Sequence, residues 1–431
     1  MNYSDTLDYL FTRLPMFQRM GPAAYKNTLA NTLLLDEYYA HPHRSFKTIH
    51  VAGTNGKGSV SHMLATVLQA AGYKIGLYTS PHLKDFRERI RIDGKMIGEE
   101  EVVNWVEKYR TNNELWKIEP SFFELTVAMA FDYFAQQKVD VAVIEVGLGG
   151  RLDSTNIIMP EVGIITNIGF DHTNLLGETL ELIAGEKAGI IKKNIPVVIG
   201  ETQEETKAVF LNKVREVNAP IYFADQEYKV AYATRGVDGM QNLQVDKNNE
   251  PFYRDLKLDL LGLYQHKNLP TVLKAVDILN DRGFKIAEQD LRTGLKQVKE
   301  ASGLQGRWQI IGANPMVVCD TGHNSDGIKE VVEQINFTPH KKLHFVFGTV
   351  GDKNPDKVLG LLPKNASYYF VKANIERALD AEVLKQHAAG FGLIGDTYSS
   401  VNEGFKKALE NAGEKDLVFV GGSTFVVAEI I

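Results

Sequence analysis

The sequence predicts an α/β protein whose strands form mostly parallel sheets. Short runs rich in Val and Ile alternate with amphipathic segments of helical period along most of the chain, a pattern typical of parallel strands joined by helices. A glycine-rich loop at residues 53–59 joins a strand to the helix that follows it, and a second series of strands begins near Trp308. The pattern therefore predicts a large α/β domain at residues 1–300 and a smaller α/β domain at residues 301–431.

The first domain is expected to begin with helices. Leucines recur at helical spacing between residues 5 and 39, and Gly21-Pro22 divides this segment into two helices. The strands expected next are residues 47–52, 74–78, 139–146, 162–168 and 195–199. The helices expected among and after these strands are residues 60–68, 99–109, 122–137, 180–191, 266–287 and 291–299. Residues 221–261 differ, because short β runs and polar turns such as residues 246–249 predict a β-rich appendage.

The second domain repeats the alternation of strands and helices. Its expected strands are residues 316–320, 343–347, 367–371 and 417–420, with helices between them. The stretch from residue 299 to residue 306 is the expected linker, which places the break between the two domains near residues 300–305.

The composition excludes several classes of protein. A hydrophobic fraction of 44% with a net charge of −6, from 48 basic and 54 acidic residues, is typical of an ordered globular chain. No basic excess is available to neutralise nucleic-acid phosphates, so no nucleic-acid partner is expected. The chain carries no apolar run long enough to span a membrane and no signal-peptide pattern at residues 1–6. Its one cysteine, Cys319, excludes an intramolecular disulfide and agrees with a cytoplasmic location.

The glycine-rich loop is the strongest chemical signal. Glycines allow backbone N–H groups to surround an anion, and the start of the following helix adds positive dipole character. Lys57 can reach the outer phosphates of a nucleotide, and the Ser59 hydroxyl can hold Mg²⁺. The loop departs from the common G-x-x-x-x-G-K-[ST] pattern, because Gly58 separates Lys57 from Ser59. The alternative is a glycine turn with an exposed lysine.

Glu145 is the second signal. A carboxylate near the end of an apolar strand is costly if it is buried and unpaired, and such strand ends line the ligand crevice of an open α/β sheet. Glu145 is therefore a candidate metal-facing partner of Ser59, with a salt-bridged structural glutamate as the alternative. The following residues 147–150 lack the G-x-G-x-x-G spacing of a dinucleotide loop.

Other polar residues follow strands or lie in short motifs. His172 follows the strand predicted at residues 162–168, although a lone histidine is more often structural. On the pattern alone, Lys187 is expected at the surface. Residues 320–327 gather polar side chains after a strand of the second domain, and an Asx-type turn is the alternative to a site. His41 and His43 are assigned to a loop in preference to a metal pair.

Several motifs in order resemble the folylpolyglutamate synthase/dihydrofolate synthase family of the Mur ligase superfamily. They are residues 50–59, 78–83, 87–90, 122–124, 145–156 and 185–190, and the resemblance covers nearly the whole chain. It implies a P-loop domain of the Mur ligase central-domain type, followed by a Rossmann-like glutamate ligase domain. Where the family reads Asp-Gly-Ala-His-Asn-Pro, residues 320–325 read Asp-Thr-Gly-His-Asn-Ser.

The resemblance implies ATP-dependent addition of L-glutamate to a folate or dihydropteroate carboxylate, through an acyl phosphate, in a cytoplasmic monomer. It implies that the catalytic residues are Lys57, His172, Lys187 and His323. Nucleotide-binding residues by the same resemblance are Gly53, Thr54, Asn55, Gly56, Lys57, Gly58, Ser59, Asn268, Arg307 and Asp320. The implied ligands of two Mg²⁺ ions are Ser59, Ser80, Glu145 and His172.

The resemblance reverses the surface interpretation of Lys187, because the family carries there a lysine that can be carbamylated by CO₂. It places His323 and Asn324 near the incoming glutamate, and nucleotide contacts from both domains imply closure around ATP. Residues 19–22 and 86–89 are candidates for the pterin site. The choice between dihydropteroate and tetrahydrofolate stays open.

Two alternative functions are kept. One is a Mur-type ligase that acts on a cell-wall precursor, and residues 79–83 favour the folate branch over it. The other is a P-loop kinase or a nucleotide-controlled switch, which would leave the second α/β domain unexplained.

Overall fold

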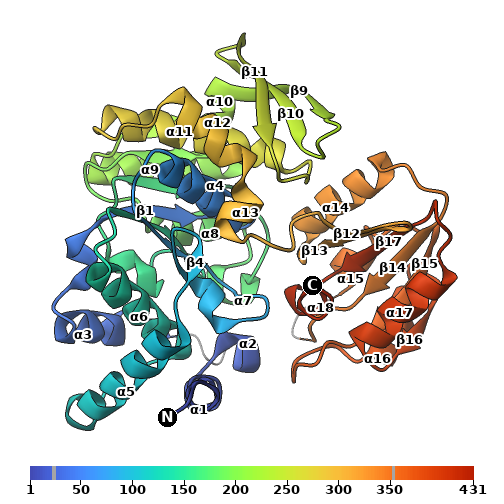
Figure 1. Cartoon of the computed structure of the whole chain (residues 1–431), viewed down its shortest axis with the longest axis horizontal. Coiled ribbons are helices and arrows are strands. Elements are labelled where there is room, and N and C mark those ends of the chain that lie inside the picture. Colours follow the sequence, from blue (N-terminus) through green and yellow to red (C-terminus); the bar gives the residue numbers. More distant parts are fainter. Residues whose placement is uncertain (22–25, 352–354) are drawn as a thin grey trace. The chain divides into compact units, whose positions relative to one another are not determined.

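The computed structural model describes residues 1–21, 26–351 and 355–431, and the chain forms two compact units (Figure 1). Unit 1 contains residues 1–259 and 265–304, and unit 2 contains residues 260–264 and 305–431. The chain therefore divides after Leu304, and a short connector at residues 260–264 belongs to the second unit.

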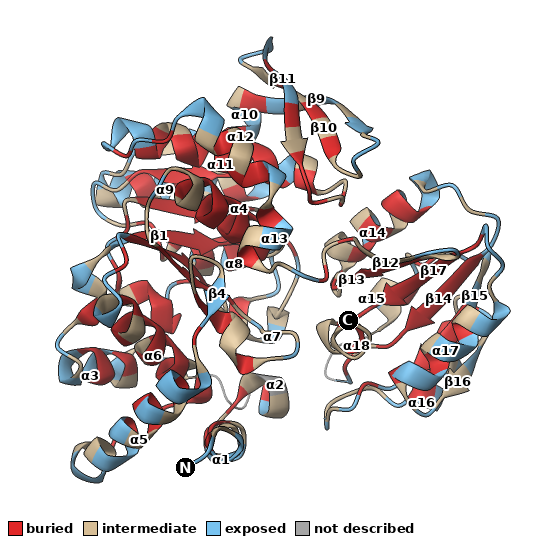
Figure 2. Cartoon of the chain, viewed as in Figure 1, coloured by how far each residue is buried: buried red, intermediate tan, exposed pale blue. Residues whose placement is uncertain are grey.

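Unit 1 is built on an eight-stranded sheet with the order β4-β3-β2-β5-β1-β6-β7-β8. Its parallel strands are β1 (Lys47–Ala52), β2 (Ile75–Tyr78), β5 (Val141–Glu145), β6 (Val162–Ile165), β7 (Val197–Ile199) and β8 (Ile221–Phe223). Two short antiparallel strands, β3 (Ile90–Ile92) and β4 (Lys95–Met96), extend one edge. The central strands β5 and β6 are buried along their whole length and mostly apolar, as expected for parallel strands covered on both faces (Figure 2).

Helices cover both faces of this sheet. The N-terminal helices are α1 (Tyr3–Asp8), the π-helical turn η1 (Tyr9–Arg13), α2 (Phe17–Met20) and α3 (Ala30–Tyr38), followed by the 3-10 turn η3 (Pro42–Ser45). The helices between the strands are α4 (Lys57–Ala70), α5 (Glu99–Trp116), α6 (Phe122–Gln136), α7 (Thr173–Leu176), α8 (Leu180–Ala188), α9 (Glu204–Val217) and α10 (Ala224–Glu227), with the 3-10 turns η4 (Phe86–Arg89) and η5 (Ser154–Ile157). Unit 1 ends with α11 (Gln265–Asp281), α12 (Glu288–Lys296) and α13 (Val298–Ser302).

The helix after the glycine-rich loop is the most enclosed of the longer helices. Every residue of α4 from Gly58 to Leu68 is buried, and α11, α12 and α13 contact it. A Cβ atom at Gly294 of α12 would lie 2.5 Å from the Val67 Cα atom, so α12 approaches the α4 backbone directly. His62 is a structural residue of this packing, because its Nδ1 atom contacts the Ser302 hydroxyl at 2.7 Å.

Two expectations for unit 1 need correction. The segment before β1 contains more than the two helices expected. A π-helical turn follows α1, and α2 stops at Met20 because the next residue, Gly21, has φ +62°, which a right-handed helix does not accommodate. Pro22 lies outside the described residues. The second correction concerns residues 221–223, which join the main sheet as its edge strand β8 and are not part of the β-rich appendage.

The appendage itself is a three-stranded antiparallel sheet. It contains β9 (Tyr228–Arg235), β10 (Gln241–Lys247) and β11 (Glu250–Leu258). The turn between β10 and β11 places Asn248 at φ +53° and Asn249 at φ +66°. Asparagine tolerates this left-handed region, which suits a tight hairpin whose twist matches the strands.

Unit 2 has a six-stranded sheet with the order β12-β13-β17-β14-β15-β16. Its strands are β12 (Gln309–Ala313), β13 (Met316–Asp320), β14 (Leu343–Phe347), β15 (Ala366–Val371), β16 (Gly395–Tyr398) and β17 (Leu417–Gly421). Its helices are α14 (Ser325–Phe337), α15 (Asp356–Leu359), α16 (Ala381–Ala389), α17 (Val401–Asn411) and α18 (Thr424–Ala428). The four strands expected from the sequence are the buried central ones, and the two unexpected strands, β12 and β16, lie at the edges and are largely polar or half-buried.

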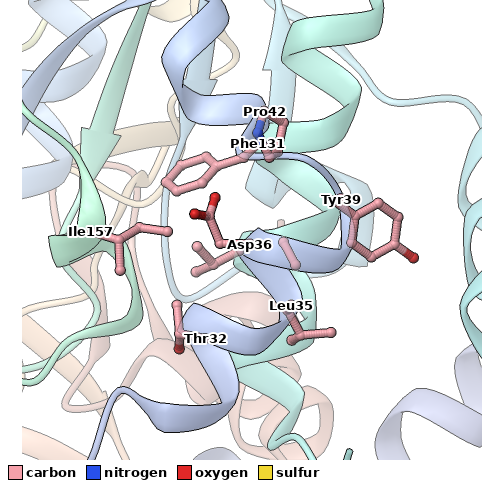
Figure 3. Close-up of a pocket in the computed structure, with 9 residues that line it drawn as sticks. Thr32, Leu35, Asp36, Tyr39, Pro42, Phe131 and Ile157 are labelled. Carbon is pink, nitrogen blue, oxygen red and sulfur yellow. The ribbon is translucent and has the colours of Figure 1, made fainter. Parts of the chain in front are cut away.

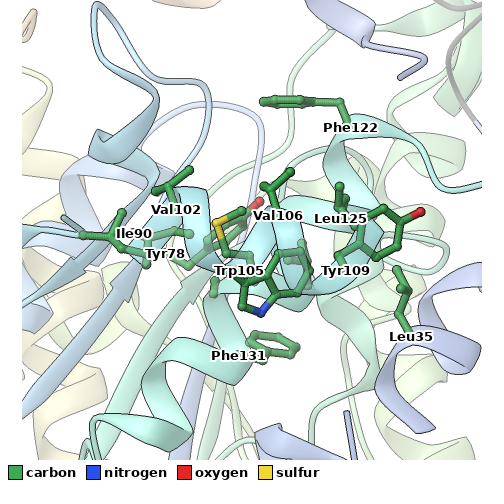
Figure 4. Close-up of a cluster of buried hydrophobic side chains, with 14 of the residues drawn as sticks. Leu35, Tyr78, Ile90, Val102, Trp105, Val106, Tyr109, Phe122, Leu125 and Phe131 are labelled. Carbon is green, nitrogen blue, oxygen red and sulfur yellow. The ribbon is translucent and has the colours of Figure 1, made fainter. Parts of the chain in front are cut away.

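An aromatic cluster supports the face of the unit 1 sheet covered by α5 and α6 (Figure 4). Trp105 of α5 stacks on Tyr39 with ring centroids 5.0 Å apart, and its Nε1 atom donates a hydrogen bond to Asp132 Oδ2 at 2.8 Å. Gln136 donates to the same oxygen at 2.8 Å. Asp132 therefore ties α5 to α6 inside an apolar cluster. In the described ranges, none of the helices combines the length and the apolar character that crossing a bilayer requires.

We predict that Asp132→Ala lowers the free energy of unfolding by about 2 kcal/mol, because it leaves the buried Trp105 N–H without its charged acceptor. Urea denaturation monitored by Trp fluorescence measures this change. Asp281→Ala, at an exposed position in α11, is the matched control. Equal unfolding midpoints for the two variants would contradict the role of Asp132.

Candidate active site

The predicted site residues of unit 1 come from four strands that are neighbours in the sheet. The order β2-β5-β1-β6 is continuous, and all four strands run parallel. Ser80 follows β2, Glu145 ends β5, residues 53–59 follow β1, and His172 lies in the connection after β6. Because the carboxyl ends of parallel strands share one edge of a sheet, four separate segments converge there.

The loop after β1 needs glycine at two positions. Gly53 has φ +146° and Gly56 has φ +86°. A Cβ atom at Gly53 would lie 1.8 Å from Thr166 Oγ1, and one at Gly56 would lie 2.2 Å from Asn268 Oδ1. Gly56 is also the N-cap of α4, so the loop leads directly into the helix N-terminus at Lys57. The resulting cradle of backbone N–H groups is suited to an anion.

Residues after β6 hold this loop in place, and the sequence prediction missed them. The Asn167 carbonyl accepts a hydrogen bond from Thr54 N at 3.0 Å, and its Oδ1 atom accepts one from Asn55 N at 2.9 Å. Thr166 Oγ1 donates to the Asn55 carbonyl at 2.5 Å, and Thr54 Oγ1 accepts from Gly169 N at 2.9 Å. The sequence feature that could have indicated them is the polar pair Thr166-Asn167 at the carboxyl end of β6, the strand that pairs with β1.

Two lysine side chains meet at one carbonyl of the loop. Lys57 Nζ donates to the Gly53 carbonyl at 3.0 Å and to the Thr54 carbonyl at 3.1 Å, and Lys187 Nζ donates to the Gly53 carbonyl at 3.0 Å. Lys187 is buried on α8, with only 4% of its surface exposed. The surface position expected from the pattern alone is therefore wrong, because Lys187 lies on the buried face of α8 with Ala184 and Ala188.

The environment changes the acid–base behaviour of Lys187. Burial, followed by the nearby charge of Lys57, lowers the pKa of Lys187 to about 7, against the opposing effect of Asp171 and Asp153. Burial removes water from the ammonium form, and a second cation repels it. Near neutral pH the side chain is therefore partly a neutral amine, which is nucleophilic.

Three of the four residues predicted to bind metal, Ser59, Ser80 and Glu145, offer side-chain oxygen atoms. Glu145 is buried, and its Oε2 atom accepts a hydrogen bond from Ser80 N at 3.0 Å. The Ser59 hydroxyl is also buried and accepts a hydrogen bond from Gln265 Nε2 at 3.0 Å. One carboxylate with hydroxyl groups fits Mg²⁺, which takes few protein ligands and completes its shell with phosphate and water. Across residues 1–21, 26–351 and 355–431, no group of three or more His, Cys, Asp or Glu side chains is arranged to hold a metal.

His172 is placed differently from the other predicted ligands. It has φ +50° and forms the N-cap position of α7. Its Nε2 atom lies 3.9 Å from Asp171 Oδ1, and its ring packs edge-on against Phe17 with centroids 5.4 Å apart. Asp171 is one of the groups whose charge acts on Lys187, so this pair belongs to the same electrostatic neighbourhood.

Asn268 lies beside the glycine-rich loop although it is distant from the loop in sequence. It lies on α11, and its Nδ2 atom donates to Gln265 Oε1 at 2.7 Å, while its Oδ1 atom faces Gly56. The residue predicted to bind nucleotide is therefore beside the glycine-rich loop, although more than 200 residues separate the two in sequence.

In unit 2, Asp320 orders the carboxyl end of β13. Its Oδ2 atom accepts hydrogen bonds from Tyr264 OH and Trp308 N, both at 2.6 Å, and its Oδ1 atom accepts from Gly322 N at 2.8 Å. Burial raises the pKa of Asp320, and hydrogen bonds and the charge of Arg307 oppose this shift. In this structure Asp320 therefore organises its own loop.

The remaining predicted residues of unit 2 surround that loop. Arg307 donates to the Thr321 hydroxyl and, at 3.2 Å, to the Gly306 carbonyl. His323 Nδ1 lies 2.9 Å from the Thr321 carbonyl, and Asn324 Oδ1 accepts from Gly327 N as the N-cap of α14. Thr321, where the family pattern has glycine, thus supplies contacts to both Arg307 and His323.

The segments suggested for a pterin site are only partly described. Arg19 belongs to α2, and Pro22 lies outside the described residues. The other segment is the turn η4 (Phe86–Arg89), in which Arg89 is buried and donates from Nε to His82 Nδ1 at 2.7 Å. Burial and the charge of Arg89 lower the pKa of His82, so a neutral histidine supports a buried guanidinium here.

A small cavity lies apart from these residues. Its lining comes from α3, η3, α6 and η5 (Figure 3). Asp36 is in the lining, and its two oxygens contact His41 Nδ1 at 2.6 Å and His43 Nδ1 at 2.7 Å. These two histidines, which the sequence assigned to a loop, therefore pair with a carboxylate beside an apolar cavity.

The chain matches known proteins over its full length. Residues 51–276 match the Mur ligase middle domain, and residues 306–424 match the Mur ligase glutamate ligase domain. A dihydrofolate synthase/folylpolyglutamate synthase of Bacillus subtilis is 32% identical over 99% of this chain and 98% of that protein.

Solved structures agree with these matches. E. coli FolC in complex with DHPP and ADP superposes with a TM-score of 0.85 at 28% identity, covering 100% of this chain and 97% of that one. Folylpolyglutamate synthase of Mycobacterium tuberculosis, complexed with ADP and AMPPCP, gives a TM-score of 0.86 at 30% identity, with 99% and 97% covered. With its loop geometry, its two matching domains and this full-length similarity, the chain belongs to the dihydrofolate synthase/folylpolyglutamate synthase family of Mur ligases.

Proposed function

We propose that the protein joins L-glutamate to the carboxylate of a folate or dihydropteroate, consuming ATP and releasing ADP and phosphate. The observation that carries this proposal is the glycine-rich cradle with two lysines at the Gly53 carbonyl, at the same sheet edge as Glu145. The complexes of related enzymes with ADP, and of FolC with DHPP, support a nucleotide and a pterin-type substrate.

The reaction divides into two displacements. An oxygen of the substrate carboxylate attacks the γ-phosphorus of ATP, the bond from that phosphorus to the β,γ-bridging oxygen breaks, and ADP leaves. The neutral amine of glutamate then attacks the carbonyl carbon of the acyl phosphate. The amine loses a proton, the carbon–oxygen bond to phosphate breaks, and an amide remains. Phosphorylation is needed because a free carboxylate has no adequate leaving group.

Phosphoryl transfer depends on positioning and on neutralising charge more than on covalent help from the protein. The N–H groups of the first turn of α4, which begins at Lys57, and the positive end of this helix are suited to a phosphate, and Lys57 adds an ammonium group beside them. We assign Ser59 and Glu145 to one Mg²⁺ ion, and Ser80 and His172 to a second. Bound magnesium would supply positive charge to the phosphate oxygens.

Lys187 is proposed to carry a carbamate. The ammonium form first loses one proton. The neutral amine then attacks CO₂, a carbon–nitrogen bond forms as one carbon–oxygen π bond opens, and a second proton is released, so that a cation becomes an anion overall. The lowered pKa of Lys187 supplies the neutral amine, and Lys57 would then face an anion in place of a second cation. The carbamate would strengthen the negative charge available to the second Mg²⁺.

The residues of unit 2 are assigned by position. Arg307 and Asp320, together with Asn268 of unit 1, are proposed nucleotide-binding residues. His323 and Asn324 are proposed to meet the incoming glutamate, because both follow the carboxyl end of β13, where ligands bind in open α/β sheets.

We expect ADP release by the purified protein to require both glutamate and a pterin acceptor. Comparing dihydropteroate with tetrahydrofolate in a coupled ADP assay, with the amide product identified by mass spectrometry, tests the function and resolves the acceptor. Activity only with a muramyl-peptide acceptor, or a stable phosphorylated product without amide, would contradict the proposal.

We predict that Lys57→Ala and Glu145→Ala each lower the rate of amide synthesis at least about a hundredfold. The first change removes a cation beside the phosphates, and the second removes a proposed ligand of magnesium. Circular dichroism and thermal unfolding should show that both variants remain folded. The exposed Lys285, at the end of the connection from α11 to α12, provides a control variant, Lys285→Ala, with normal activity. Near-normal turnover in either site variant would refute its assignment.

We predict that Lys187→Ala is weakly active and is partly rescued by small carboxylates, which replace the lost anion. In the wild-type protein, carbamate formation should increase as pH rises through about 7, because the amine is neutral only above its pKa. NMR after incubation with isotopically labelled bicarbonate measures the carbamate carbon, and Lys187→Ala should lack that signal. A wild-type protein that shows no carbamate signal at pH 8 with excess bicarbonate would refute the carbamate.

A further inference from the structure

Gln265 connects two predicted site residues without itself being one of them. Its side chain is completely buried at the start of α11. Its Nε2 atom donates to Ser59 Oγ at 3.0 Å, and its Oε1 atom accepts from Asn268 Nδ2 at 2.7 Å. One amide therefore links the hydroxyl on α4 to the amide that faces Gly56.

This chain of hydrogen bonds has a definite polarity in the structure. Asn268 presents its Nδ2 atom to Gln265, and its Oδ1 atom lies toward Gly56. Of the two polar atoms of the Gln265 amide, only the oxygen can accept a hydrogen bond from Asn268 Nδ2. The Gln265 nitrogen therefore faces Ser59. A hydroxyl has one proton and two lone pairs, and Gln265 occupies one lone pair of Ser59.

This contact restricts the position of the Ser59 hydroxyl oxygen. A serine in a helix has a competing arrangement, in which the hydroxyl donates to a carbonyl three or four residues earlier. For Ser59 those carbonyls belong to Gly56 and Asn55, and the Asn55 carbonyl already accepts from Thr166 Oγ1. The N–H group of Gln265 binds one lone pair of the Ser59 oxygen and leaves the second lone pair available to a ligand.

We infer that Gln265 is a positioning residue that orients the Ser59 hydroxyl for Mg²⁺, with Asn268 fixing the direction of the Gln265 amide. This inference rests on the proposed metal role of Ser59. Groups that orient a metal ligand through a hydrogen bond change metal affinity by about ten- to a hundredfold when they are removed. Gln265 touches neither substrate nor metal in this scheme, and its effect on magnesium passes through Ser59.

The test measures binding and does not require turnover. The dissociation constant of a non-hydrolysable ATP analogue is measured by isothermal titration calorimetry, once with Mg²⁺ and once with EDTA, and the ratio of the two constants gives the magnesium effect. We expect Gln265→Met to reduce the magnesium effect about tenfold, while binding in EDTA changes by less than about threefold. Gln265→Asn, which keeps an amide too short to span both partners, should behave in the same way and serves if the Met variant does not fold.

A matched control uses another buried amide near the same helix start. Gln241 is buried in β10, and its Oε1 atom contacts His266 Nε2 at 2.7 Å, so we expect Gln241→Met to keep the full magnesium effect. Equal weakening of binding in Mg²⁺ and in EDTA by Gln265→Met would show a general structural role and overturn the inference.

A double-mutant cycle separates this inference from the proposed function. If Gln265 acts through Ser59, then Gln265→Met adds nothing to the loss already caused by Ser59→Ala. Additive losses would overturn the inference and leave the role of Ser59 standing. An unchanged magnesium effect in Ser59→Ala would overturn both, whereas the glutamate requirement of ADP release still decides the function.

Discussion

The Gly53 carbonyl accepts a hydrogen bond from each of two lysine side chains, Lys57 and Lys187. Two ammonium groups at one oxygen repel each other, and burial deprives Lys187 of the water that would screen the repulsion. The lowered pKa of Lys187 is the direct consequence. The carboxylates of Asp171 and Asp153 offset this shift only in part, and the negative charge of a phosphate or a carbamate would reduce the repulsion further. The anion binding and the carbamate proposed for the site both depend on the two lysines that share the Gly53 carbonyl.

That carbonyl is held by the packing of unit 1. Gly53 can be nothing larger than glycine because Thr166 occupies the place of its Cβ atom. The helix that follows is buried from Gly58 to Leu68 and is covered by α11, α12 and α13. A loop fixed at one end by a neighbouring strand and at the other by an enclosed helix cannot rearrange at low cost. The N–H groups in the first turn of α4 are therefore held in place before an anion binds, which is the condition for electrostatic stabilisation in a transition state.

The sequence predicted the parts of the site that are expressed in local patterns. The glycine-rich loop, the carboxylate at the end of β5 and the four central strands of unit 2 are recognisable because each lies within one short segment. It could not place Lys187, because burial of a lysine depends on which face of α8 meets β1 and its loop. It also missed Thr166, Asn167 and Gln265, whose roles come from contacts with residues more than 100 positions away. Polar edge strands such as β16 carry too little apolar alternation to be predicted.

The proposed carbamate and the nucleotide compete for the same positive charge, and this sets an order of events. Lys187 reacts with CO₂ only as a neutral amine, and its neutral form is favoured by burial and by the repulsion from Lys57. Phosphates beside Lys57 would weaken that repulsion and favour the ammonium form of Lys187. Carbamate formation is therefore easiest before nucleotide binds. Once formed, the proposed carbamate would place a negative charge beside Lys57, which would reduce the attraction of the loop for a polyphosphate. A bound magnesium ion would offset that charge, so the modification would make ATP binding depend more strongly on magnesium.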